Sequence, residues 1–100
     1  MFGTIGHVRP KPGHEAQMQA LMADWKQTVR PLLPGRFVEM IGAPKDRPGE
    51  MVFLALAQDE ATYRALAELP EQQAFYQRMI EHTEGEPTWE DVSMEIVVQD

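Results

Sequence analysis

The sequence predicts an α+β fold of the ferredoxin-like type, with the element order βαββαβ and a four-stranded antiparallel sheet. Two observations predict it. Apolar residues recur at spacings of three and four in two separate stretches, which indicates two helical regions. Short apolar and β-branched stretches stand before, between and after those regions, and turn residues separate them. The 100 residues form one predicted domain, residues 1–100.

The first half of the chain is predicted to contain a strand, a helix and a second strand. The first strand lies in "MFGTIGHV" and ends at "RPKPG", where two prolines and a glycine indicate a turn. The helix runs from about His14 to Arg30, because Pro31 disfavours helical geometry at the residue before it. "RFVEMIGA" follows as the second strand. The apolar face of the helix comprises Met18, Leu21, Met22, Trp25, Val29 and Leu32.

The second half is predicted to contain a strand, an interrupted helix and a last strand. "PKDRPGE" is a turn, and "MVFLALA" after it is the third strand. Asp59 is the expected N-cap of a helix in "EATYRALAEL", since an aspartate side chain can accept a hydrogen bond from a free amide of the first turn. "EGEP" is a loop, and "TWEDVSMEIVVQ" is predicted to be the final strand.

Pro70 interrupts the second helical region, in "ALAELPEQQAFYQRMIEH". A proline inside a helix removes a backbone donor and clashes with the preceding turn, at a cost of about 3 kcal/mol. The apolar residues before Pro70 and those after it also point in different directions on one helical wheel. We therefore expect two helices that meet at Leu69 and Pro70, with Pro70 at the first position of the second, where its missing N–H costs nothing.

The third strand also predicts how the protein associates. In a βαββαβ chain with right-handed crossovers, both helical regions cover the same face of the sheet. "MVFLALA" is nevertheless apolar at every position, and hence on both faces. The uncovered apolar row must be buried by something else, and the sheet of a second copy is the simplest cover. The sequence therefore predicts a homodimer with two-fold symmetry.

Composition and charge exclude several classes of protein. Sixteen acidic residues against nine basic ones give a net charge of −7, which disfavours binding to nucleic acid or to an anionic membrane surface. No apolar run approaches the about 20 residues of a membrane helix. The absence of cysteine removes disulfides, thiolate metal ligands and a cysteine nucleophile. With no secretory signal pattern at the start, the expected location is the cytoplasm.

Known catalytic motifs are missing from the chain. The only serine, Ser93, lies in a predicted strand and away from any nucleophile elbow. No HExxH motif, glycine-rich phosphate loop or EF-hand spacing occurs. The three histidines, His7, His14 and His82, are far apart in sequence, so spacing predicts no metal site.

What remains is a group of aromatic and titratable side chains. His7 on the first strand is a candidate proton acceptor, because histidine titrates near neutral pH, and an inert histidine at a dimer seam is the alternative. Tyr63 and Tyr76, on the two halves of the broken helix, each bring an apolar ring and a polar tip. These three are the candidate catalytic residues. Trp89 is expected at the dimer contact. The candidate ligand-binding residues are Trp25, Leu66, Phe75, Met79 and His82.

The chain resembles the antibiotic-biosynthesis-monooxygenase type of dimeric α+β barrel over nearly all its length. The resemblance is carried by "PKPG" before the first helix, "FLALAQDEATYRAL", the break at "ELPEQ", and "GEPTWEDVSMEIVV". It implies a homodimer whose two sheets form a barrel, with a pocket between sheet and helices in each subunit. Family members include cofactor-independent oxygenases of aromatic polyketides and quinols, haem-degrading enzymes, and proteins with no assigned reaction.

The haem-degrading branch is disfavoured residue by residue. That branch uses an asparagine on the first strand, and a tryptophan and a histidine around the broken helix. The corresponding positions here hold Gly6, Ala65 and Phe75, and the chain contains no asparagine. Two functions stay open. One is a cofactor-independent monooxygenase acting on a small aromatic or quinol-type substrate. The other is a non-catalytic homodimer that binds a small ligand or acts as a scaffold.

Overall fold

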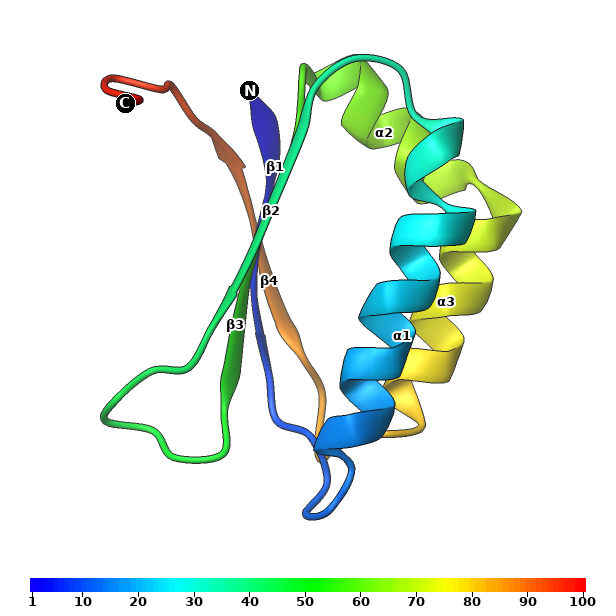
Figure 1. Cartoon of the computed structure of the whole chain (residues 1–100), viewed down its shortest axis with the longest axis vertical. Coiled ribbons are helices and arrows are strands. Elements are labelled where there is room, and N and C mark those ends of the chain that lie inside the picture. The colour runs from blue at the N-terminus through cyan, green and yellow to red at the C-terminus, as the bar shows by residue number, and fades with distance from the viewer.

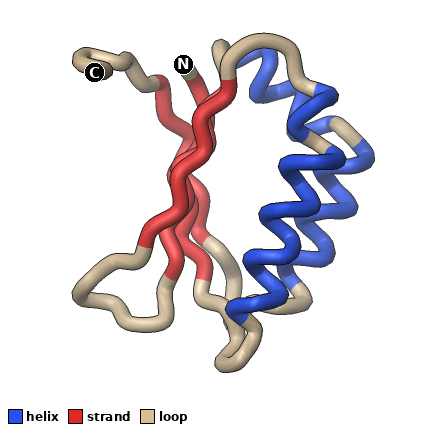
Figure 2. The backbone as a smooth tube through the Cα atoms, in the orientation of Figure 1, coloured by secondary structure: helices blue, strands red, loops and turns tan.

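The computed structural model describes residues 1–100 and has one sheet with helices on one side (Figure 1). The order βαββαβ and the ferredoxin-like arrangement are confirmed. Figure 2 shows the strands as one layer and the helices as a second layer beside it. The elements are β1 (Phe2–Val8), α1 (Glu15–Thr28), the short 3₁₀ helix η1 (Arg30–Leu32), β2 (Phe37–Gly42), β3 (Met51–Ala57), α2 (Glu60–Glu68), α3 (Pro70–Ile80) and β4 (Thr88–Ser93).

The sheet has the strand order β2-β3-β1-β4, and all three pairings are antiparallel. The third strand, which is apolar at every position, is therefore central in the sheet. The register places Trp89, Gly6, Phe53 and Ile41 in one row across the sheet. The neighbouring row on the same face contains Asp91, Thr4, Ala55 and Glu39, because side chains alternate between faces with a period of two.

The hydrophobic core lies between this face and the helices. Met18 is fully buried on α1, and Met79 on α3 is 2% exposed. They meet Val8 and Phe53, which project from the two central strands. The face of α1 that apolar spacing predicts is thus the face that packs in the core, and it includes Met18, Leu21 and Trp25. The complete buried cluster is Val8, Met18, Leu21, Trp25, Val29, Leu33, Phe53, Leu66, Phe75 and Met79.

The predicted break at Pro70 is confirmed. Leu69 has extended backbone angles, with φ −66° and ψ 131°, and it separates α2 from α3. Pro70 occupies the first position of α3, where no intrahelical partner for its nitrogen is needed. The expected N-cap is also present, since the Asp59 side chain accepts a hydrogen bond of 2.8 Å from the Thr62 N–H. Two helices at different angles can therefore cover one face of the sheet.

The last strand is shorter than the sequence predicts. β4 ends at Ser93, which pairs with Phe2, and Met94 then exchanges two backbone hydrogen bonds of 2.8 Å with Met1. Residues 95–100 pair with no other strand, so the apolar run "IVV" forms no ladder. The predicted strand to Gln99 was wrong because a strand needs a hydrogen-bonded neighbour as well as β-favouring residues.

The other face of the sheet has no helix on it (Figure 1). It carries Ile5, Val52 and Leu54, which are half-buried, and Met40, which is 62% exposed. We call this side the open face and the other the covered face. None of the helices has the length and apolar character needed to cross a membrane.

Candidate functional site

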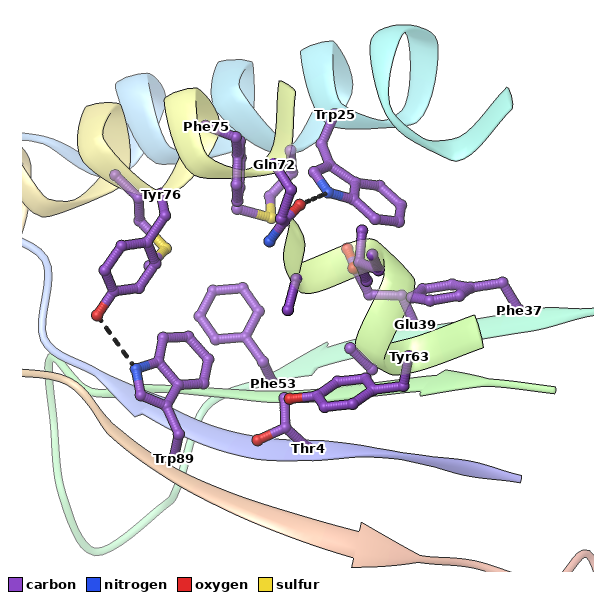
Figure 3. Close-up of a pocket in the computed structure, with 15 residues that line it drawn as sticks. Thr4, Trp25, Phe37, Glu39, Phe53, Tyr63, Gln72, Phe75, Tyr76 and Trp89 are labelled. Carbon is purple, nitrogen blue, oxygen red and sulfur yellow. Dashed lines mark hydrogen bonds between the residues drawn. The ribbon is translucent and has the colours of Figure 1, made fainter. Parts of the chain in front are cut away.

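A cavity of about 260 Å³ lies between the covered face and the helices (Figure 3). Its volume is roughly that of nine water molecules in the liquid, which is enough for a small ring compound. Fifteen residues from every strand and from α1, α2 and α3 line it: Thr4, Met22, Trp25, Phe37, Glu39, Phe53, Ala55, Tyr63, Leu66, Ala67, Gln72, Phe75, Tyr76, Met79 and Trp89. Most of these side chains are apolar or aromatic, as is usual for small-molecule sites.

The broken helix forms much of the cavity wall. α3 presents Gln72, Phe75, Tyr76 and Met79, whose spacing of three and four puts them on one side of the helix. α2 contributes Tyr63, Leu66 and Ala67 from before the break. The bend at Leu69 thus lets both helices line the same cavity.

One polar group of the cavity is held by a tryptophan. The Trp25 Nε1–H donates a hydrogen bond of 2.7 Å to the Gln72 Oε1. This bond fixes the orientation of the Gln72 amide, because its oxygen is the atom that faces the indole. The amide nitrogen then lies on the other side of the group, and Figure 3 shows it directed toward Phe53. Gln72 therefore offers N–H donors to the cavity.

A second polar pair closes the opposite end of the cavity. The Trp89 Nε1–H lies 3.4 Å from the Tyr76 hydroxyl oxygen and donates to it, with the two ring centroids 6.0 Å apart. Gly6 makes room for the indole, since a Cβ at this position would lie 2.3 Å from a ring carbon of Trp89. The register turns Trp89 to the covered face rather than the open one, and a dimer contact at Trp89 stays a prediction.

Tyr63 lies along the floor of the cavity. Its hydroxyl donates a hydrogen bond of 3.1 Å to the Asp91 Oδ1, and its ring meets Phe2 edge-on at 5.4 Å. Burial is the main cause that raises the pKa of Tyr63 above its ordinary value of 10.0, and the Asp91 carboxylate adds to it. The phenol is therefore neutral near pH 7, and its hydrogen points at Asp91.

Glu39 is the only charged side chain in the cavity lining. It projects from β2 at the mouth of the cavity, where it is exposed to solvent on one side and lines the cavity on the other. Desolvation by the surrounding apolar groups raises its pKa above the ordinary value of 4.5, and no hydrogen bond or charge in the chain offsets this shift. Glu39 is not among the residues predicted from the sequence. The available signal was the alternation in "RFVEMIGA", which puts positions 37 and 39 on the same face.

Six of the eight residues predicted from the sequence line the cavity. They are Trp25, Tyr63, Leu66, Phe75, Tyr76 and Met79.

His7 and His82 do not line the cavity. The expectation that His7 shares the pocket with the tyrosines was wrong, because positions 4 and 6 of β1 face the helices and position 7 faces the open side. There the His7 Nδ1 lies 3.5 Å from the Glu50 Oε1. His82 follows the end of α3 and shares a hydrogen bond of 3.0 Å between its Nδ1 and that of His14. No three His, Asp or Glu side chains are arranged to hold a metal ion.

Solved structures share this fold. A candidate antibiotic biosynthesis monooxygenase from Caulobacter crescentus matches with a TM-score of 0.79 at 19% identity, over 94% of this chain and 90% of that chain. SnoaB, a cofactor-independent oxygenase from Streptomyces nogalater, matches with a TM-score of 0.68 at 15% identity, over 96% of both chains. An uncharacterized NIPSNAP domain protein from Burkholderia xenovorans matches with a TM-score of 0.67 at 17% identity, over 100% of both chains.

The comparisons by sequence found no relative. No protein-family model matches the chain, and no curated protein matches it. The resemblance to the antibiotic biosynthesis monooxygenases is thus confirmed by their structures, at the level of the fold.

Proposed function

We propose that the protein oxidises a small aromatic or quinol-type substrate with molecular oxygen, without a cofactor, in the cavity between the sheet and the helices. The observation that carries the proposal is the cavity itself, about 260 Å³ in volume and walled by aromatic side chains with a few polar groups. The fold adds support, because SnoaB, which has the same fold, is a cofactor-independent oxygenase.

In the proposed reaction the substrate supplies the electrons, and the protein needs only to bind and orient it. The keto tautomer of a quinol has an activated ring CH₂, which loses a proton to water and becomes an electron-rich anion that reacts with O₂. One oxygen atom enters the new C=O group and the other leaves as water, so the two C–H bonds supply the four electrons that O₂ takes up. The protein contributes an apolar site that orients the ring, and polar groups that bind its oxygen atoms.

Tyr76 is the better placed of the two candidate tyrosines. Its oxygen accepts from the Trp89 indole, so its own O–H is free to donate to a substrate oxygen. The hydrogen of Tyr63 is already directed at Asp91. We therefore propose Tyr76 as the hydrogen-bond donor to the substrate, and Tyr63 as a wall of the site.

Oxygen consumption tests the proposal. Purified protein with 1,4-naphthohydroquinone should consume O₂ faster than the uncatalysed reaction does. Ala67→Trp should abolish the excess rate, because Ala67 lines the cavity and is exposed, so an indole there fills the site at little cost to folding. Ala65→Trp, at an exposed position on the same helix but outside the lining, is the matched control. Ligand binding without excess O₂ consumption would support the alternative, a non-catalytic binding protein.

We also propose that two copies associate through their open faces to form a two-fold barrel. Half-buried and exposed apolar side chains on this face, including Ile5, Leu54 and Met40, are the support. A self-complementary apolar surface favours a symmetric dimer.

A further inference from the structure

We infer that the cavity selects a planar aromatic ligand with a hydroxyl group at one end and an acceptor oxygen at the other. Glu39 accepts the hydrogen bond of the hydroxyl, and Tyr76 donates to the acceptor oxygen. Quinols and hydroxyaryl ketones belong to this class. The inference deepens the proposed function, on which it rests, by naming the substrate class and by assigning a role to Glu39.

Glu39 is the one carboxylate of the covered face that is left available. Asp91 lies in the same row of the sheet, but it accepts the Tyr63 hydroxyl at 3.1 Å and lies 3.5 Å from Arg64. Glu39 has neither a hydrogen bond nor a nearby charge that favours its ionised form. The Glu39 carboxylate lines the cavity mouth and has no hydrogen-bond or ion-pair partner in the chain, so a ligand hydroxyl can donate a charge-assisted hydrogen bond to it.

The other end of the cavity offers a donor. The Tyr76 oxygen receives the Trp89 N–H, so the phenol can turn its hydrogen toward the cavity. Trp89 is seated over Gly6, where the missing side chain lets the ring lie close to the strand. Trp89 donates to the Tyr76 hydroxyl and accepts no hydrogen bond from it. The Tyr76 hydrogen is therefore free to bind a ligand oxygen.

The two ends are separated by the width of the sheet. Glu39 is on β2 and Trp89 is on β4, which are the outer strands in the order β2-β3-β1-β4. Three interstrand spacings of about 4.8 Å place these strands about 14 Å apart. Figure 3 shows Glu39 and Phe37 at one side of the cavity and Tyr76 and Trp89 at the other, with Phe53 between them. The side chains reach inward from both ends, so a fused ring system fits with its long axis across the strands.

The same arrangement excludes other ligands. A carboxylate or phosphate on the ligand would face the Glu39 carboxylate at one end, and like charges repel most strongly where water is partly excluded. The net charge of −7 on the chain adds a weaker, long-range repulsion of anions. The expected ligands are therefore neutral before they bind.

Three two-ring probes test the inference by binding alone. 6-Hydroxy-1-tetralone has both groups, 6-methoxy-1-tetralone lacks the hydroxyl donor, and 5,6,7,8-tetrahydro-2-naphthol lacks the ketone. Quenching of tryptophan fluorescence reports binding, since Trp25 and Trp89, the two tryptophans of the chain, both line the cavity. The wild type should bind the hydroxy ketone about 10-fold more tightly than the methoxy ketone, the factor typical of a hydrogen bond to a charged group.

Single substitutions test the role of each end of the cavity. Glu39→Met should reduce the preference for hydroxyl over methoxy to about one, and should leave the affinity for the methoxy ketone unchanged. Glu90→Met removes a carboxylate on the open face and should leave the preference intact. Tyr76→Phe should remove the preference for the hydroxy ketone over the naphthol, while the preference for hydroxyl over methoxy persists.

The wild-type measurements decide the outcome without any variant. Equal affinity for the hydroxy and methoxy ketones, or no binding of the hydroxy ketone up to its solubility limit, would overturn the inference. Oxygen uptake is measured separately. Selective binding without oxygen uptake refutes only the proposed oxidation, and oxygen uptake without selective binding refutes only the roles of Glu39 and Tyr76.

Discussion

Both faces of the sheet carry apolar side chains, but the two faces meet different surroundings. On the covered face, Val8 and Phe53 are 1% and 5% exposed, and the helices complete a core with a cavity. On the open face, Val52 and Leu54 are only half-buried, and Met40 is 62% exposed. Apolar composition alone does not distinguish a ligand site from an association surface. The difference lies in the polar groups that the covered face encloses.

Two glutamates illustrate the same contrast. Glu39, on the covered face, has its pKa raised by desolvation. Glu50, at the end of the sheet near His7, has its pKa lowered, chiefly by the hydrogen bond from Arg47. The first carboxylate has no partner for its charge, whereas the second is surrounded by cations. Only Glu39 is therefore placed to gain from a ligand.

Replacing Phe53 should have the largest effect on the covered face. Phe53→Ala should lower the free energy of unfolding by about 3–5 kcal/mol, since the ring is 5% exposed in the core. Because its contacts lie within one chain, the loss should be the same at low and high protein concentration. Urea denaturation at two concentrations measures both. A loss that depends strongly on concentration would contradict the separation of the two faces.

A charge at Leu54, which follows Phe53 and faces the open side, should instead weaken association of the two copies. Wild-type protein should sediment at micromolar concentration with about twice the 11.4 kDa chain mass. Leu54→Lys should raise the dissociation constant of the proposed dimer by at least about 100-fold, because a lysine would be buried without a partner at the centre of the interface. Gln77→Lys, on an exposed helix position, should change nothing. A folded monomeric wild type would refute the dimer.

Tyr63 should make the stability of the protein depend on pH in the alkaline range. Its folded pKa lies above the ordinary 10.0, so its contribution to stability is complete below that value and is lost as the pH rises through the folded pKa. Wild-type stability should therefore fall more steeply than that of Tyr63→Phe as the pH rises above the ordinary pKa of 10.0. Thermal unfolding across this range measures the difference. Parallel curves for the two proteins would show that Tyr63 does not couple folding to pH.

Replacing Pro70 should have the smallest effect. Pro70→Ala should change the free energy of unfolding by less than about 1 kcal/mol, because proline at a first helical position mainly restricts the unfolded chain. The cavity should persist, since the extended backbone of Leu69, rather than the proline ring, separates the two helices. Probe binding that is unchanged in this variant checks the point. Loss of binding would mean that the ring itself holds the bend.

Local patterns were enough to predict the helices and most of the cavity wall. Pro70 marked the break, and Asp59 marked the start of α2, because both act through their own backbone neighbours. The helical residues Trp25, Leu66 and Phe75 were found from spacing, since a helix face is set by its own 3.6-residue period.

The strands were harder to interpret because a period of two defines two faces without saying which one is covered. His7 was assigned to the pocket and Trp89 to the dimer contact, and each lies on the opposite face to the one expected. Glu39 was not predicted, because the alternation in its strand shows that it shares a face with Phe37 but does not show which face the helices cover.

The sequence by itself therefore determined the order of the elements, the broken helix and the acidic, cysteine-free character of the chain. Those features depend on composition and on contacts between near neighbours. Only the tertiary structure decided the faces of the strands, the end of β4 at Ser93, and the meeting of Glu39 with Tyr76 across one cavity. These depend on hydrogen bonds between segments far apart in sequence, and a shift of one residue in register would reverse every side chain of a strand.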